Sequence, residues 1–80
     1  MALNQNIKAF LKALPPNMMS LILFDGASQI IGFAVSDADD HRGLTKIYDS
    51  DCREVSAVPL GTTVKDMVDV LIRRKCAYIV

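Results

Sequence analysis

Residues 7–14, IKAFLKAL, align without gaps with residues 64–71, VKDMVDVL, and both segments have the apolar spacing of an amphipathic helix. Each copy leads into an apolar run, at residues 21–23 in the first case and at residues 78–80 in the second. Internal repetition of this kind marks repeated supersecondary units. The chain is therefore predicted to contain two helix-then-strand units.

The first unit has recognisable boundaries. Asn4 or Asn6 is expected to cap the first helix, and the prolines at positions 15–16 end it. Residues 18–24 form an apolar run short enough to be a buried strand. Turn residues follow at 25–28, where Gly26 is expected to take a positive φ, and residues 30–35 are predicted to return as the second strand of a hairpin. Gly32 inside that strand permits close approach of another backbone or of a ligand.

The second half is less regular. Residues 36–43 are polar and predict a loop or a single helical turn, and the runs at 44–48 and 53–58 predict either a second hairpin or one broken strand. Thr62 or Thr63 is expected to cap the second helix, with Asp66 completing a capping box. Residues 76–80 predict a terminal strand. We therefore expect one α+β domain spanning residues 1–80, in the order α-β-β-β-β-α-β, with two layers: two amphipathic helices on one face of a small, mostly antiparallel sheet.

The composition predicts a homodimer. The chain has 80 residues, 51% of them hydrophobic, with a mean hydropathy of +0.27. A domain of this size buries only about 60% of the surface that its unfolded chain exposes, so the surplus apolar surface is expected to lie against a second copy.

The charge balance and the targeting signals limit the classes of partner and the cellular compartment that we expect. Nine basic and nine acidic residues cancel, which removes the general attraction to phosphate, and we expect no nucleic-acid partner. No apolar run is long enough to span a membrane, and no signal-peptide pattern is present, so no membrane partner and a cytoplasmic location are expected. Cys52 and Cys76 are then predicted to be free thiols.

The sequence offers little catalytic chemistry. Asp37, Asp39, Asp40 and His41 are the candidate metal ligands, but an EF-hand counted from Asp37 would place Arg42 and Tyr48 where glycine and glutamate are required. His41 is the only histidine, and a lone histidine in a polar loop is typical of a surface residue rather than of a general base for Ser36 or Cys52. We expect neither an enzyme, nor a metal site, nor a cofactor.

Two segments have features of a phosphate site. Residues 59–63 open a helix, whose backbone N–H groups attract anions, although the glycines and lysine of a P-loop are absent and the threonines are explained as caps. Between Gly32 and Asp39, a strand glycine is followed by the Ser36 hydroxyl and the Asp39 carboxylate, which suit a sugar phosphate. An ordinary strand end followed by a helix cap explains the same residues.

The order helix, strand, Asp-Gly turn, strand, Ser-x-x-Asp resembles a CBS domain, the module named after cystathionine β-synthase. Residues 53–80 resemble the start of a second copy, and the spacing of the two repeated segments is similar to that of tandem CBS motifs. The resemblance implies pairs of modules that dimerise and bind an adenosine nucleotide in the cleft between them, regulating an attached enzyme or channel. It assigns Ser36 to phosphate or ribose and Asp39 to ribose hydroxyls.

The sequence departs from the family pattern in two places. Ser36 stands four residues after Gly32, where the family has three, and the second half ends before a hairpin of its own. We therefore prefer a non-enzymatic protein-interaction or assembly module that works as a homo-oligomer. The alternative is a CBS-like regulatory module that binds an adenosine nucleotide at a dimer cleft near Gly32, Ser36 and Asp39.

Overall fold

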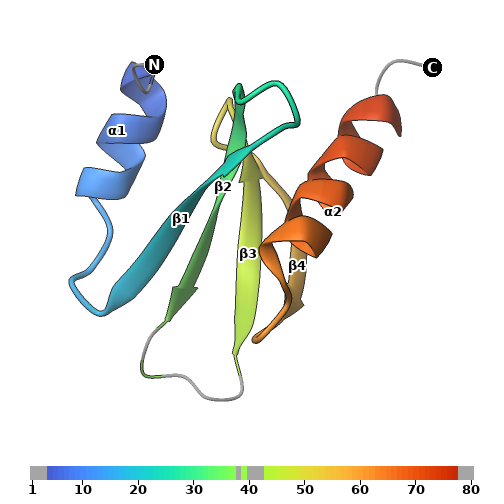
Figure 1. Ribbon diagram of the computed structural model, residues 1–80. Coiled ribbons are helices and arrows are strands. Elements are labelled where there is room, and N and C mark those ends of the chain that lie inside the picture. Colours follow the sequence, from blue (N-terminus) through green and yellow to red (C-terminus); the bar gives the residue numbers. More distant parts are fainter. Residues whose placement is uncertain (1–3, 38, 40–42, 78–80) are drawn as a thin grey trace.

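The computed structural model describes residues 4–37, 39 and 43–77. Two helices flank four strands: α1 (Gln5–Lys12), β1 (Met18–Phe24), β2 (Ile30–Asp37), β3 (Leu44–Asp49), β4 (Glu54–Pro59) and α2 (Val64–Ala77). The strands form one antiparallel sheet in chain order, β1-β2-β3-β4 (Figure 1). The predicted α+β class and first hairpin are confirmed, and residues 44–58 form a second hairpin rather than a broken strand.

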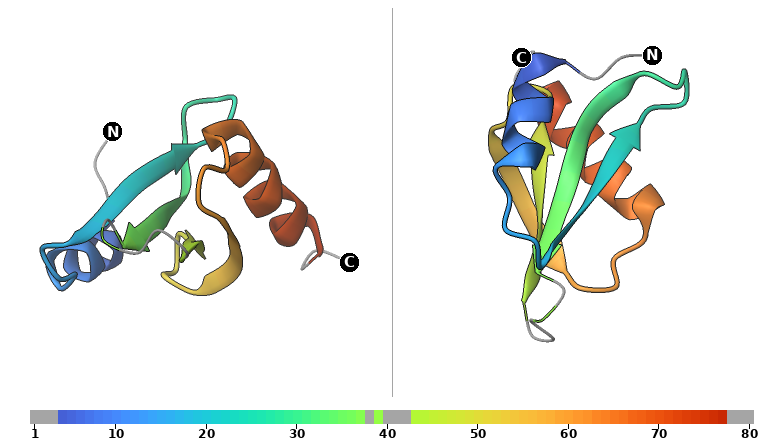
Figure 2. Two further views of the ribbon diagram at one scale, coloured as in Figure 1. Left: turned by 90° about the horizontal axis from the view of Figure 1, so that it is seen from below. Right: turned by 90° about the vertical axis from the view of Figure 1, so that its left-hand side faces the viewer.

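The helices lie on opposite faces of the sheet, so the prediction of two layers with both helices on one face is wrong. Figure 2 shows α1 in front of the strands and α2 behind them. The reason is visible in β2, where four consecutive residues, 32–35, are all buried. Since successive strand residues point to opposite faces, a strand buried at every position needs a cover on both sides.

Helix α1 covers one face through an aromatic cluster. The Asn4 side chain caps the helix, accepting a hydrogen bond of 2.8 Å from the Ile7 N–H. Ile7 and Phe33 are fully buried, and the Phe10 ring centroid lies 5.2 Å from that of Phe33 and 4.9 Å from that of Tyr48. Aromatic pairs of this geometry contribute about 0.5–1.5 kcal/mol each beyond their burial. An eight-residue helix is too short to be stable alone, so this packing holds α1 in place.

Helix α2 covers the other face. The Thr63 hydroxyl accepts a hydrogen bond of 3.2 Å from the Asp66 N–H, which confirms Thr63 as its cap. The helix buries Met67 and Leu71 against Leu23, Ala34 and Ile47 of the first three strands. The apolar stripe predicted for α2 is packed at Met67, Val68 and Leu71, but Val64, expected to belong to it, is 51% exposed. The two helices pack against opposite sides of the same sheet.

The two hairpins have the same turn. In each, an aspartate, Asp25 or Asp49, accepts hydrogen bonds of 2.9–3.0 Å from the backbone N–H groups two and four residues later. The residue three positions after the aspartate has a positive φ, 61° at Ser28 and 63° at Cys52. The prediction of a positive φ at Gly26 is therefore wrong. These are three-residue loops, in which a type I turn is followed by a left-handed residue.

Three further predictions need correction. Strand β2 continues to Asp37, two residues beyond the expected end. Cys76 and Ala77 belong to α2 rather than to a terminal strand, and the rest of that predicted strand lies outside the described residues. Strand β1 has the predicted bounds but is not a buried strand, because Leu23 is its only buried residue.

Candidate functional site

One exposed apolar part of the described surface is the free edge of β1; Leu44, Leu60 and Val64 are exposed elsewhere. Within the described part of the chain this strand pairs with β2 alone, so the backbone groups along its outer side have no partner strand there. Its seven residues, MMSLILF, include no charge and no proline. Three of its large apolar side chains are exposed, Met19 by 55%, Leu21 by 43% and Phe24 by 48%. We call this strand, with those three side chains, the β1 edge.

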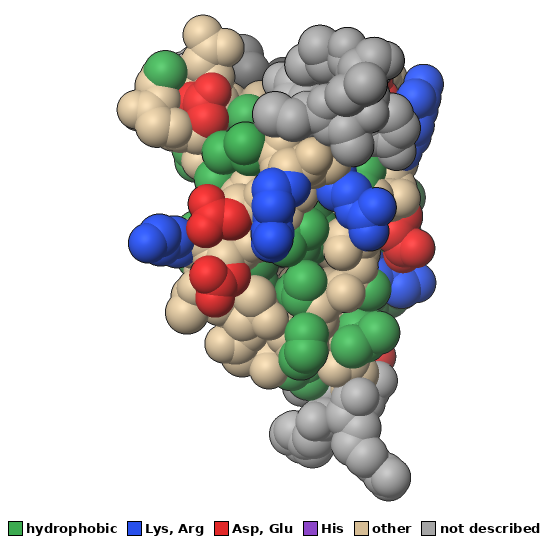
Figure 3. Space-filling view, turned by 90° about the vertical axis from the view of Figure 1, so that its right-hand side faces the viewer, with side chains coloured by type: hydrophobic (Ala, Val, Ile, Leu, Met, Phe, Trp, Pro, Cys, Tyr) green, Lys and Arg blue, Asp and Glu red, His purple; other side chains and the backbone are tan. Residues whose placement is uncertain are grey.

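Incomplete cover by α2 explains part of this exposure. By alternation Met19, Leu21 and Leu23 point to the α2 face of the sheet, yet only Leu23 packs beneath the helix. Met19 and Leu21 therefore leave apolar surface on β1 that the helix does not cover. Figure 3 shows the outer side of α2, where charged side chains form a band and hydrophobic side chains gather below it.

The opposite edge of the sheet, β4, is protected. It is one residue shorter than β1, ends at Pro59 and begins at Glu54, whose carboxylate lies 3.6 Å from the Lys46 ammonium. The pairing of β3 with β4 also contains an irregularity between Ile47 and Tyr48. Charge, proline and a bulge are the devices by which natural sheets discourage edge-to-edge pairing. The β1 edge has neither a charge nor a proline. The irregularity in its pairing with β2 lies at its last residues, between Leu23 and Phe24.

Of the residues predicted to bind a ligand, Gly32 and Ser36 lie in β2 and Asp39 lies two residues beyond its end, and none of them lines either of the two cavities described below. The position above Gly32 is occupied by the protein itself, because a Cβ atom there would overlap the Tyr48 carbonyl oxygen and lie 2.9 Å from Leu71 Cδ1. Ser36 is half-buried near the end of β2, opposite Met19. Asp39 is exposed, and its N–H donates to Asp37 Oδ1 at 2.9 Å. The close approach predicted at Gly32 is thus to a backbone and an apolar side chain.

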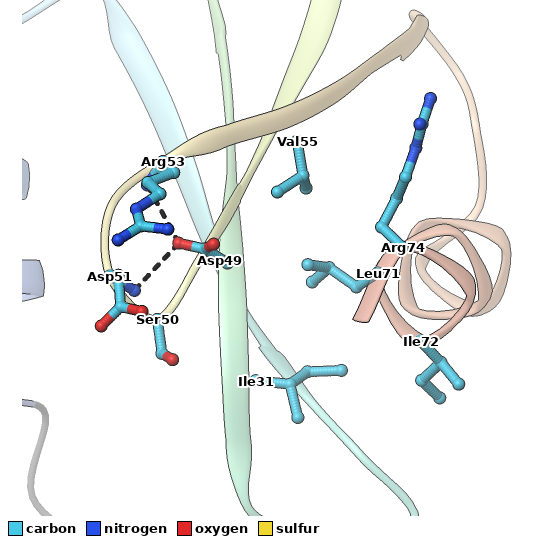
Figure 4. Close-up of a pocket in the computed structure, with 9 residues that line it drawn as sticks. All are labelled: Ile31, Asp49, Ser50, Asp51, Arg53, Val55, Leu71, Ile72 and Arg74. Atoms are coloured by element: carbon cyan, nitrogen blue, oxygen red, sulfur yellow. Dashed lines mark hydrogen bonds between the residues drawn. The ribbon is translucent and has the colours of Figure 1, made fainter. Parts of the chain in front are cut away.

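A cavity lies elsewhere, between the β3–β4 turn and α2. Its volume is about 260 Å³. The walls carry four apolar side chains, Ile31, Val55, Leu71 and Ile72, while Arg53 and Arg74 lie on opposite sides of it (Figure 4). The turn residues Asp49, Ser50 and Asp51 complete the lining. We call this cavity the α2 pocket.

The β3–β4 turn connects the α2 pocket to α1. The Asn4 amide, whose oxygen caps α1, donates a hydrogen bond of 3.1 Å to the Ser50 carbonyl. On the same turn, Cys52 packs against the α1 cluster. Burial raises the pKa of the Cys52 thiol, and the carboxylates of Asp49 and Asp51 raise it further. The thiol is therefore a packed, protonated group at neutral pH and a poor nucleophile.

The described residues bring together little reactive chemistry. Across residues 4–37, 39 and 43–77, no three residues drawn from His, Cys, Asp and Glu are placed to share a metal ion. Of the predicted ligands, Asp37 and Asp39 are described, whereas Asp40 and His41 lie outside the described residues. Cys52 is a free thiol, as predicted, and the side chain of Cys76 lies outside the description.

No protein-family model matches the chain, and neither a curated protein nor a solved structure is similar to it at the threshold of the comparison. Within the described part of the chain, neither helix has the length and apolar character needed to cross a membrane.

Sequence reasoning missed both the β1 edge and the α2 pocket. For the edge a signal existed: seven successive residues without a charge in a predicted hairpin strand. For the pocket none was available, because its walls come from three separate segments, around residue 31, at 49–55 and at 71–74.

Proposed function

We propose that this chain is a non-enzymatic assembly module that forms a homodimer by pairing its β1 edge with the β1 edge of a second copy. The observation that carries the proposal is the contrast between the two edges of one sheet, of which β4 is protected and β1 is not. An exposed, uncharged and apolar edge strand is a template for pairing with another strand.

The sequence of β1 favours antiparallel pairing with itself. With Leu21 opposite Leu21 of the second copy, Met19 faces Leu23, Ser20 faces Ile22 and Met18 faces Phe24. No like charges meet, because the strand carries none. The Asp25 N–H donates toward β2, to the Gln29 carbonyl. Since backbone groups alternate along a strand, those of Ser20 and Ile22 point to the free edge and can bond across the dimer.

Pairing in this register joins two sheets into one of eight strands. The exposed parts of Met19 and Leu21 then lie beside their counterparts on the α2 face, which removes apolar surface from water at about 25 cal/mol per Å². This accounts for the surplus of apolar residues in a chain of 80. It also leaves both helices in place, so the protomers need no rearrangement.

Charged substitutions at Leu21, the residue that faces its own counterpart in the proposed dimer, test the proposal. The L21K and L21E variants each place like charges opposite one another, and we expect both to sediment as monomers where the unsubstituted chain is a dimer. An equimolar mixture of the two is expected to restore a dimer, because Lys then faces Glu. The matched control is A57K, which adds the same charge at an exposed position of the other edge and should leave the dimer intact.

Two results would overturn this proposal. One is sedimentation of the unsubstituted protein as a monomer at about 100 μM, a concentration well above the Kd of typical specific complexes. The other is a dimer that persists in L21K, which would place the contact elsewhere on the surface.

The alternative function, binding of an adenosine nucleotide near Gly32, Ser36 and Asp39, has less support. Those three residues line no common cavity among the described residues, and the protein's own atoms fill the position above Gly32. Thermal melting with AMP, ATP or S-adenosylmethionine separates the two functions. A ligand at a hundred times its Kd adds about 2.7 kcal/mol to the free energy of unfolding. Pairing at the β1 edge predicts no such change.

A further inference from the structure

We propose that the α2 pocket binds a small amphipathic anion, a molecule with an apolar body about the size of a fused two-ring system and one acidic group. The site lies apart from the β1 edge and does not depend on dimerisation.

The walls suit an apolar body. Ile31, Val55 and Leu71 come from β2, β4 and α2, and Figure 4 shows them directed into the space between the turn and the helix. A cavity of about 260 Å³ is small for a ligand site, since drug-sized molecules occupy roughly 300–1,000 Å³. It fits one ring system rather than an extended chain.

Of the two acidic residues at the rim, Asp49 is engaged through its carboxylate, whereas Asp51 takes part through its backbone N–H alone. Asp49 Oδ1 accepts hydrogen bonds from the Asp51 and Arg53 N–H groups, at 2.9 and 3.0 Å, and these bonds hold the turn. For Arg53 and Arg74, by contrast, no side-chain hydrogen bond or ion pair exists with another described residue. The two arginines and two aspartates at this rim cancel in formal charge, so the preference for an anion rests on the hollow next to it.

A second hollow adjoins the first at Arg74. It is lined by Ser56, Val70, Arg73 and Arg74, two arginines and a hydroxyl without a carboxylate among its described lining residues. Arg73 is held in position by a hydrogen bond of 3.4 Å from its Nε to the Asp69 carbonyl. Because Arg74 borders both hollows, a ligand can place its apolar body in the α2 pocket and its acidic group beside Arg74 and the Ser56 hydroxyl. Guanidinium groups bind carboxylates, sulfonates and phosphates through paired N–H donors.

The probe for this site is naphthalene-1-sulfonate, with naphthalene as the analogue that lacks the sulfonate. We expect the sulfonate to bind up to about fivefold more tightly, the size of one exposed charge pair. That preference should be lost in R74Q. The matched control is K65Q, which removes the same charge from the other end of α2 and should bind both probes normally.

Further variants and a spectroscopic measurement locate the probe. Ile72 is 42% exposed, so I72Q leaves the core intact while making one wall polar, and it should weaken both probes. Backbone amide shifts on titration should concentrate at residues 31, 53–55 and 71–74. Any of three results would overturn the proposal: probe binding that is unchanged in both R74Q and I72Q, amide shifts that centre on residues 19–24, or no preference for the sulfonate. The L21K variant separates this result from the proposed function, because it abolishes the dimer but should still bind the probe.

Discussion

Leu71 of α2 lies directly over Gly32 of β2, so that a Cβ atom on the glycine would stand 2.9 Å from Leu71 Cδ1. The same Cβ would overlap the Tyr48 carbonyl oxygen of β3, a backbone atom that cannot rotate away. The helix therefore approaches the sheet at a point where the strand has no side chain. This contact sets the separation between α2 and the sheet, and with it the width of the α2 pocket, whose wall includes Leu71.

Replacement of Gly32 by alanine is predicted to be strongly destabilising. The added methyl group must displace either Leu71 or the β3 backbone, and overpacking of this kind costs about 1–3 kcal/mol or more. The measurement is the free energy of unfolding in urea. Gly26→Ala is the matched control, because a Cβ atom there meets nothing within 4 Å and the backbone φ is not positive. If the two variants have equal stability, the close contact at Gly32 is not formed in solution.

Ser28→Gly is predicted to stabilise the protein. Ser28 is exposed and has a φ of 61°, a conformation that costs an L-residue roughly 1 kcal/mol and costs glycine nothing. Part of the gain is offset because glycine increases the entropy of the unfolded chain, so we expect a net increase of about 0.5 kcal/mol in the free energy of unfolding. Ala27→Gly, one residue earlier, also increases the entropy of the unfolded chain but relieves no positive φ, so it should be destabilising. Loss of stability in both variants would contradict the turn geometry.

Phe10 is predicted to hold α1 on the sheet. Its ring contacts both Phe33 and Tyr48, which are themselves stacked with centroids 5.0 Å apart. Phe10→Ala removes this contact and should cost about 2–3 kcal/mol, less than for a fully buried phenylalanine because the residue is only half-buried. Amide hydrogen exchange should accelerate in α1 more than in α2, since the helices pack on different faces. The exposed Lys8→Ala is the control, and uniform acceleration in both helices would argue against separate clusters.

The first helix, the first hairpin and the start of the second helix were predictable because each has a local signal, whereas the pattern at residues 44–58 allowed either a hairpin or one broken strand, and the strand predicted from residue 76 is part of α2 as far as Ala77. Asn4 and Thr63 are strong caps, the prolines after α1 stop it, and the Asp25 turn separates two apolar runs. Strand β1 begins and ends where its apolar run does. These signals depend on neighbours within four residues, and such interactions survive any tertiary arrangement.

The placement of the helices was not predictable in this way, because it depends on which face of the sheet each apolar stripe meets. One clue was present: residues 32–35, Gly-Phe-Ala-Val, do not alternate between apolar and polar, and a strand of that kind is buried on both faces. The positive φ was expected at glycine on general grounds, yet the turn places it at Ser28 and again at Cys52. The aspartate three residues before each was the better indicator of the turn, since its side chain accepts two backbone N–H groups in both hairpins.

Cys52 gives a prediction for pH dependence. Burial is the largest cause of its raised pKa, followed by the carboxylates of Asp49 and Asp51. Alkylation by iodoacetamide, followed for the Cys52 peptide by mass spectrometry, should therefore have a midpoint above the value of about 8.5 for an unperturbed thiol. Asp51→Asn should lower this midpoint, because the Asp51 carboxylate is exposed and its charge is removed without loss of the turn, which Asp49 holds.

The raised pKa of Cys52 also determines whether the free energy of unfolding rises or falls with pH. A thiol with a raised pKa binds its proton more tightly in the folded state, so its contribution is fully present below the pKa of the unfolded chain. As the pH rises above about 8.5, the unfolded chain loses the proton first, and the free energy of unfolding falls until the folded thiol also ionises. Cys52→Ser, which does not titrate in this range, should flatten this part of the profile. Two outcomes would mean that the thiol is not packed against the α1 cluster. One is an alkylation midpoint at or below that of an unperturbed thiol. The other is a free energy of unfolding that rises between pH 8.5 and 10 and is unaffected by Cys52→Ser.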